Sequence, residues 1–349
     1  MNPQPPQRRF GRFSGVDEAW LAKRPREAVI DPELPIIDTH HHLWDRSHHR
    51  YLIHELLADM NSGHNTIATV FLQCNSMYRV RGPAEMRPVG ETEFVAGVAA
   101  MSDSGGYGPA RICAGIVGFA DLTHDRAQAV LEAHVAAGGG RFRGVRHSAA
   151  WDADERIGNS SSVSGGGLYR DGTFHAGLNA LTKLGLSLDA WVFHPQIHDV
   201  TMLARSHPDA NIILGHIGGV LGYGNYLGRR DEIFASWKTS MTELAKCPNV
   251  TVKLGGVMMR LAAFDYINSP LPPTSEELAE LWKPWMTTCI EMFGADRCMF
   301  ESNFPVEKMG SSWVTLWNAF KLIAAGSSAD EKAALFSGTA QRAYRLDLA

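Results

Sequence analysis

Eight short apolar segments recur along the chain, and each ends in polar residues. They cover residues 35–40, 66–73, 111–118, 142–147, 186–193, 211–215, 249–254 and 297–302. Most are nearly continuous apolar runs rather than alternating ones. This pattern is typical of strands that are buried on both faces of a parallel sheet.

Helical patterns fill the intervals between these segments. The clearest, at 125–137, ends at the three glycines 138–140, and the others are predicted at 176–184, 197–206, 231–246, 275–293 and 329–345. Eight strands that alternate with helices predict an α/β fold, a distorted (β/α)8 TIM barrel over 35–349 that follows an N-terminal extension, 1–34. A doubly wound open sheet is the alternative, but no G-x-G-x-x-G follows the first strand.

Composition narrows the class of protein. The 349 residues are 45% hydrophobic and 20% charged, as in soluble globular proteins. A net charge of −4 gives no reason to expect a nucleic-acid or membrane partner, and no apolar run is long enough to span a bilayer. The N-terminus lacks the apolar core of a secretory signal. Five scattered cysteines without a C-x-x-C favour reduced thiols and a cytoplasmic location.

Histidines mark three of the strand ends, where barrels of this kind build their sites. The first strand ends in His40-His41-His42, the fifth in His194 and the sixth in His216. Residues two apart on a strand share a face, so we expect His40 and His42 to point to one place and His41 to point away. Three such ends predict a divalent-metal site rather than separate core histidines.

Other polar side chains lie at or after strand ends: Arg146, His147, Lys253, Tyr78 and Arg79. Arg146, His147 and Lys253 suit a substrate carboxylate, since arginine pairs with it through two donors, and Tyr78 and Arg79 would line the mouth of the site. The alternative for each is a rim residue without a role. Arg146 and His147 are adjacent, so on a regular strand only one of them should point inward. The Ser/Gly-rich run 158–167 should lie on the rim of the site.

Four motifs together resemble a known family. His40-x-His42, Phe-His-Pro at 193–195, Gly-His-x-Gly-Gly at 215–219 and Phe-Glu-Ser-Asn-Phe-Pro at 300–305 are similar to those of the amidohydrolase superfamily, in its amidohydrolase-2 branch. That branch includes sugar-acid and pyrone-dicarboxylate lactonases and aminocarboxymuconate-type decarboxylases. The resemblance covers residues 35 to about 345. It implies that His40, His42 and His194 bind a metal and that His216 is a general base or orients water. Zinc is the first expectation, with manganese, iron and cobalt as alternatives.

One departure concerns the eighth strand. The branch usually places an aspartate there, in a Ser-Asp-x-Pro pattern, where this chain has Asn303. Asparagine does not ionise and is a poor zinc ligand, so this departure puts in doubt whether the metal is held tightly and whether it is needed. Glu301, two residues earlier, either supplies the missing carboxylate or is a buried acid paired with Arg146 or Lys253. His216, Glu301 and Asn303 are therefore the catalytic candidates.

These patterns predict a hydrolase of a small lactone, or of a related ester or amide. A water polarised by metal or histidine would attack the carbonyl, and the small-molecule substrate would be anionic. A non-oxidative decarboxylase of the same branch is one alternative. A degenerate barrel that acts as a binding protein or partner subunit is another. Barrels of this kind often pair, so a homo-oligomer is expected as readily as a monomer.

Overall fold

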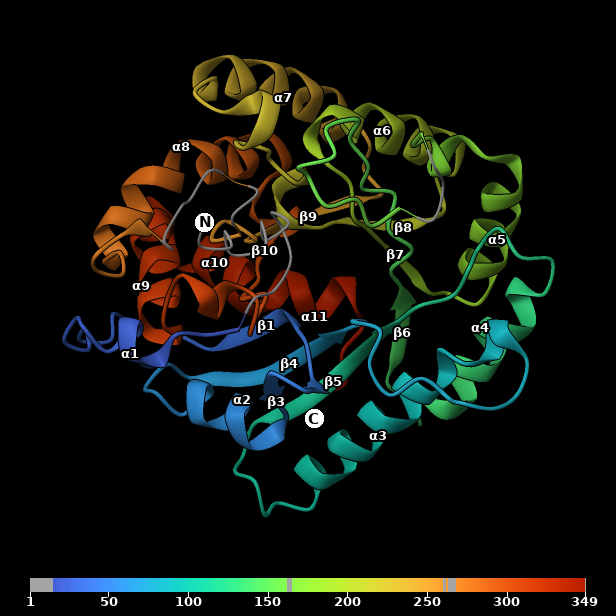
Figure 1. The fold of residues 1–349 in the computed structure, drawn as a ribbon, viewed down its shortest axis with the longest axis horizontal. Helices are drawn as coiled ribbons and strands as arrows, with labels where there is room; N and C mark the ends of the chain where they lie inside the picture. Colours follow the sequence, from blue (N-terminus) through green and yellow to red (C-terminus); the bar gives the residue numbers. More distant parts are fainter. Residues whose placement is uncertain (1–14, 162–164, 260–261, 263–267, 349) are drawn as a thin grey trace, which may run out of the picture.

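Eight parallel strands form the centre of the molecule in the order of the chain. The computed structural model describes residues 15–161, 165–259, 262 and 268–348. The strands are β1 (Ile36–His41), β4 (Thr66–Leu72), β5 (Arg111–Gly118), β6 (Phe142–Val145), β7 (Ser187–Ala190), β8 (Asn211–Leu214), β9 (Val250–Leu254) and β10 (Cys298–Phe300). All eight predicted strands are present, and together they make a nearly closed barrel with helices around it (Figure 1).

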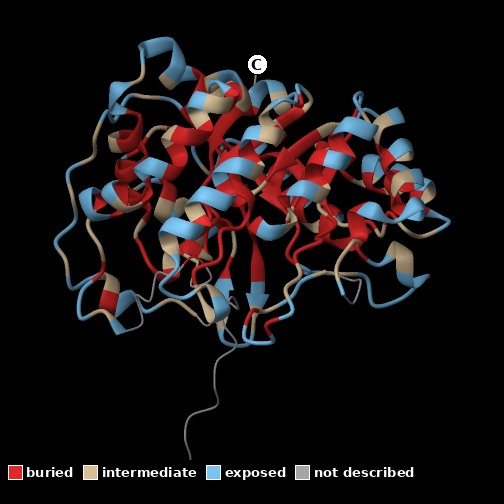
Figure 2. Ribbon diagram, turned by 90° about the horizontal axis from the view of Figure 1, so that it is seen from above, coloured by how far each residue is buried: buried red, intermediate tan, exposed pale blue. Residues whose placement is uncertain are grey.

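One short helix precedes the first strand, and the other helices follow strands and cover the outside of the barrel. The helices are α1 (Glu18–Leu21), α2 (Ile53–Met60), α3 (Val89–Asp103), α4 (Ala127–Ala137), α5 (Gly172–Lys183), α6 (Ile197–Ser206), α7 (Arg230–Ala245), α8 (Ser275–Phe293), α9 (Trp313–Ile323), α10 (Ala329–Ala333) and α11 (Thr339–Ala343). Strands and inward helix faces are buried, and outward helix faces are exposed (Figure 2). None of the described helices is both long and apolar enough to cross a membrane.

The sequence pattern located helices α4 to α8 and missed four others, α1, α2, α3 and α9. Helix α9 escaped because it is buried around most of its circumference and so has no polar stripe. Helix α3 escaped because small and polar residues, Gly90, Glu91 and Thr92 among them, make up much of its buried face. The predicted last helix, 329–345, is divided into α10 and α11 by a π-helical turn at Ala334–Gly338.

The barrel closes where the first strand meets the last. Beyond β10, the Asn303 N–H donates to His40 O at 2.8 Å, and the His42 N–H donates to Phe304 O at 2.8 Å. The Asp38 carboxylate accepts from the Ser302 N–H at 2.8 Å and from its hydroxyl at 2.7 Å. These bonds tie the ends of β1 and β10 together, so the residues at this seam are held in fixed positions.

The segment before β1 lies against helix α9. Ile30 N donates to Asn318 Oδ1 at 2.9 Å. Lys321 Nζ donates to Ile30 O, Asp31 O and His64 Nδ1 at 2.7–2.9 Å. A buried lysine with three acceptors is fully satisfied, so this contact anchors the segment.

A small hairpin separates β1 from the next barrel strand. Strands β2 (Trp44–Arg46) and β3 (His49–Tyr51) pair antiparallel directly after the histidines of β1. The hairpin therefore stands at the carboxyl end of the barrel, where it can form part of the wall of a site.

Candidate active site

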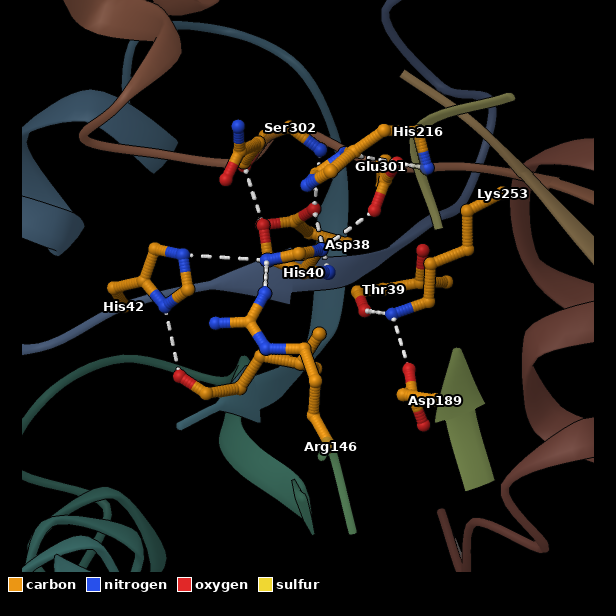
Figure 3. A network of polar contacts seen from close by, with 12 residues as sticks. Asp38, Thr39, His40, His42, Arg146, Asp189, His216, Lys253, Glu301 and Ser302 are labelled. Carbon is orange, nitrogen blue, oxygen red and sulfur yellow. Dashed lines mark hydrogen bonds and ion pairs between the residues drawn. The ribbon is translucent and has the colours of Figure 1, made fainter. Parts of the chain in front are cut away.

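A buried carboxylate joins two of the predicted histidines. Glu301 Oε1 accepts from Nδ1 of His216 at 2.7 Å and from its backbone N–H at 2.8 Å. Glu301 Oε2 contacts His40 Nδ1 at 2.6 Å (Figure 3). Burial alone would raise the pKa of Glu301, but the His216 contacts and the charge of Lys253 hold that pKa below its ordinary value. The carboxylate is therefore ionised and accepts from Nδ1 of both rings, so the Nε2 of each ring faces away from Glu301.

His216 is the ring that faces the cavity. It follows β8, has a positive φ of 54°, and the indole of Trp191 packs edge-on against it at 4.8 Å. Two glycines after β9 make room for this arrangement. A Cβ on Gly256 would lie 2.4 Å from His216 Cγ, and one on Gly255 would lie 2.3 Å from Glu301 Cγ. The sequence analysis overlooked this Gly-Gly pair, although its place directly after a strand was a usable signal.

His40 and His42 face each other, as the strand alternation predicted. Their Nε2 atoms are 3.2 Å apart, and His42 Nδ1 donates to Leu72 O at 2.8 Å. Burial is the main cause that holds the pKa of each ring well below its ordinary value, so both are neutral. His41 points elsewhere, and its Nε2 contacts Thr69 Oγ1 at 2.9 Å.

The Nε2 atoms of His40 and His42, at the carboxyl end of β1, are suited to bind a divalent cation. Both Nδ1 protons are held by acceptors, and the two Nε2 lone pairs converge, as is usual for metal-binding histidines. His40, His216 and Glu301 also have potential ligand atoms within 4.8 Å of one another. We favour the Nε2 pair, because the atoms around Glu301 are already joined by N–H···O bonds. Arg146 Nη1 lies 3.2 Å from His40 Nε2 and is a competing donor.

Arg146 and His147 both reach the cavity, contrary to the expectation that only one would. The reason is that β6 ends at Val145, so the alternation of a regular strand no longer applies to the next two residues. Arg146 also donates to Gln73 O. His147 Nδ1 accepts from Leu122 N at 3.2 Å, and burial lowers the pKa of this ring to about 4.

Lys253 lies below the cavity and is not among the residues that line it. Its fully buried ammonium contacts Asp189 Oδ1 at 2.9 Å and Thr39 O at 2.8 Å (Figure 3). Tyr344 donates to the same Asp189 oxygen at 2.6 Å. This network neutralises a buried charge, and it is a different set of partners from the Glu301 pairing considered from the sequence. The substrate-binding role of Lys253 stays a prediction.

His194 is not brought together with the other histidines. Its Nδ1 accepts from Leu221 N at 3.3 Å, and its ring packs edge-on against Tyr226 at 5.1 Å. Burial lowers the pKa of the ring to about 4. If Nδ1 accepts, the proton of the neutral ring is on Nε2, which leaves no free lone pair. The role of His194 as a metal ligand stays a prediction that this geometry does not favour.

Tyr78 and Arg79 lie in the loop after β4, outside the cavity lining of the described residues. The Tyr78 hydroxyl donates to Asn75 Oδ1 at 3.0 Å. Arg79 pairs with Glu93 on the surface, with Nε to Oε2 at 3.1 Å. Their predicted place at the mouth of the site stays a prediction.

The cavity above these residues has a volume of about 420 Å³, within the ~300–1,000 Å³ usual for small-molecule sites. Trp44, Trp191, Phe119 and Phe193 give it apolar walls. Its polar lining in the described part of the chain contains arginine, histidine and neutral groups but no carboxylate: His42, Arg46, Gln73, Asn75, Arg146, His147, Ser148, Ser160, Ser161, His216 and Asn303.

Arg46 is a lining residue that the sequence analysis missed. It ends strand β2, its guanidinium lies 4.0 Å from the centre of the Trp44 ring, and its Nη2 donates to Cys74 O at 3.2 Å. No described carboxylate pairs with it. An arginine that is stacked on an indole and opens to a cavity is placed to bind an anion. The only signal was its position four residues after His42.

Comparison with known proteins identifies the family. The profile of the amidohydrolase family matches residues 37–346, so the chain belongs to that family of enzymes. An uncharacterised protein, y4mH of Sinorhizobium fredii, is 31% identical over 336 residues, which are 90% of this chain and 99% of the relative. An L-fucono-1,5-lactonase of Burkholderia multivorans is 28% identical over 243 residues, 68% of this chain and 73% of the relative.

Solved structures agree on the fold. A zinc-bound amidohydrolase from Burkholderia multivorans is 26% identical with a TM-score of 0.68, covering 89% of this chain and 99% of its own. A manganese complex of 5-carboxyvanillate decarboxylase from Novosphingobium aromaticivorans is 15% identical with a TM-score of 0.56, covering 90% and 97%. At 15% identity, the similarity to the decarboxylase structure supports the shared barrel fold and nothing further.

Proposed function

We propose that this enzyme hydrolyses the ester bond of a small lactone. The observation that carries the proposal is the Glu301–His216 pair, in which Glu301 holds Nδ1 of a histidine that lines the cavity. Glu301 fixes the tautomer, so His216 can take a proton from a water that attacks the lactone carbonyl and pass it to the leaving oxygen. The 28% identity to an L-fucono-1,5-lactonase is consistent with this reaction.

His40 and His42 would hold a divalent ion, with zinc the first choice. Their converging Nε2 atoms fit it, and a related amidohydrolase structure contains zinc. When bound, the ion would polarise the carbonyl and lower the pKa of water. Arg146 lies on the same His40 nitrogen, so its positive charge should weaken the affinity for the ion.

The substrate would carry a negative charge. Arg46 and Arg146 line a cavity without any described carboxylate, so an anionic substituent would meet two guanidinium groups. The aromatic walls would pack against the ring of the lactone. This favours sugar-acid or pyrone lactones that bear a carboxylate over neutral sugar lactones.

The test is acid release from a panel of lactones near neutral pH, with and without a chelator. The panel contains neutral L-fucono-1,5-lactone and the carboxylated glucarolactone and pyrone dicarboxylate. His216→Gln should abolish turnover, whereas His198→Gln, a change at an exposed histidine of α6, should leave it unchanged. No acid release on any member, with zinc added back, would overturn the proposal.

A decarboxylase is the second candidate. A cationic cavity would also bind an aromatic carboxylate, and a decarboxylase shares the fold. Asn303 counts against it, because decarboxylases of the branch resembled here generally keep the aspartate at that position. Release of carbon dioxide without net acid from hydroxybenzoates would favour this candidate over the lactonase.

A further inference from the structure

The amide of Asn303 is held by a second buried carboxylate. Asn303 follows β10 and lines the cavity with 2% of its surface exposed. Its φ of 53° is a left-handed conformation that asparagine adopts more readily than most residues. Its Nδ2 donates to Glu307 Oε1 at 3.3 Å.

Glu307 is fixed in turn by the neighbouring strand end. Its side chain is fully buried and does not line the cavity. Its other oxygen, Oε2, accepts from the backbone N–H of Met258 in the loop after β9. The Glu307 N–H also donates to Asn303 O at 3.2 Å, which closes one turn of chain between the two residues.

This arrangement determines which end of the amide faces the substrate. Burial raises the pKa of Glu307 to about 8, and the Met258 and Asn303 donors act against that rise. In the structure both oxygens accept, Oε2 from the Met258 N–H and Oε1 from Asn303 Nδ2, so the NH2 group is directed to Glu307. The amide oxygen then points away from Glu307 and is left as an acceptor on the cavity side. An aspartate at this position would instead put two carboxyl groups in contact, where both cannot ionise without strong repulsion.

We propose that Glu307 is a positioning residue that orients the Asn303 amide, and that the two residues form a matched pair at the end of β10. The Asn303 oxygen would accept a hydrogen bond from the attacking water or from a substrate hydroxyl. The catalytic part of this inference rests on the proposed lactonase function. The pairing of Glu307 with Asn303 does not depend on that function.

A double-mutant cycle tests the pair. Asn303→Asp should lower kcat by about a hundredfold. Glu307→Gln should lower it by about tenfold with KM within threefold, because the introduced glutamine can turn the Asn303 amide around. In the double variant N303D/E307Q, the introduced glutamine can donate to the introduced aspartate while its oxygen still accepts from the Met258 N–H. We therefore expect the double variant to recover at least tenfold in kcat over Asn303→Asp alone.

Thermal unfolding of the same four proteins gives a readout that does not need a substrate. Asn303→Asp should lower Tm, and adding Glu307→Gln should restore part of that loss. If wild type hydrolyses no lactone, the proposed function fails and the Tm cycle still decides the pairing. Additive effects in Tm, and in kcat where it can be measured, would overturn the inference.

A further variant covers the case in which Glu307→Gln does not fold. Asn303→Ser removes the amide without adding a charge, and its loss of kcat should be at least tenfold with the fold retained. A kcat within twofold of wild type would show that the oriented amide has no role.

Discussion

The floor and the mouth of the site hold their polar groups in different ways. The floor, His40, His216 and Glu301 with Lys253 and Asp189 beneath, is almost wholly buried, and the structure gives each of these groups a bonded partner. At the mouth, Arg46 lies in a hairpin and is partly exposed, and Ser160 lies in a loop and is exposed. The Ser148 and Ser160 hydroxyls bond to each other at 2.7 Å. Buried fixed dipoles suit a reaction centre, whereas loop residues can change from relative to relative to select a substrate.

The largest effect is expected at the centre of the floor. Glu301→Gln keeps the shape but cannot accept from both imidazoles, so one ring must turn or lose its partner. Turnover of the best lactone should fall by ~10²–10⁴ with the fold retained by circular dichroism. The matched control is Glu291→Gln, at an exposed glutamate of α8. Turnover within threefold of wild type would contradict the role of Glu301.

Lys253→Met tests whether the lower floor is structural. Removing the cation leaves Asp189 buried with only neutral donors, so the free energy of unfolding should fall by roughly 3–5 kcal/mol in urea titration. Lys283→Met, at an exposed lysine of α8, should have little effect. A rise in KM with unchanged stability would instead support the substrate-binding role predicted from the sequence.

Arg46→Gln should alter the mouth without altering the floor. A hydrogen bond to a charged group contributes ~1.5–3 kcal/mol, so kcat/KM for a carboxylated lactone should fall about tenfold or more. The value for a neutral lactone should stay within twofold, and Arg81→Gln on an exposed loop should change neither. Equal losses on both lactones would remove Arg46 as a determinant of specificity.

His134 is a buried neutral histidine outside the site, so it should affect the pH dependence of stability and not the activity. His134 on α4 contacts Thr92 Oγ1 at 2.8 Å and Phe119 O at 2.9 Å, and burial lowers its pKa to about 4. The unfolded chain takes up this proton near pH 6.5 and the folded chain only near pH 4. Stability from this source is therefore present above pH 6.5 and lost as the pH falls to 4, by up to ~1.4 kcal/mol per pH unit. In His134→Gln the free energy of unfolding should change less steeply with pH over this range, because unfolding then takes up one proton fewer. An unchanged slope would contradict the assignment.

The smallest effect is expected at His194. If its Nε2 carries the proton, His194→Gln should leave the zinc affinity, measured by calorimetry, within threefold of wild type. A loss of thirtyfold or more would restore the metal-ligand role that the family resemblance implies.

The sequence predicted the barrel well because buried parallel strands leave a one-dimensional signal. All eight strands were found, and so was the common orientation of His40 and His42, which follows from strand alternation alone. The positions of several site side chains could not be predicted, because they depend on where each strand ends and its turn begins. The end of β6 at Val145 brought both Arg146 and His147 to the cavity. The turns after β7 and β8 gave His194 partners away from the other rings. Arg46, Glu307 and the Gly255-Gly256 pair act through contacts with distant segments, which no local pattern records.

The seam between the first and last strands has a consequence for the timing of synthesis. His40 and Glu301 are 261 residues apart in the chain, so the ribosome makes the histidines long before it makes the carboxylate that orients them. A nascent chain that lacks β10 has no Glu301 and no Asn303. The enzyme should therefore gain its reactivity in a single late step, and released fragments should carry none of it.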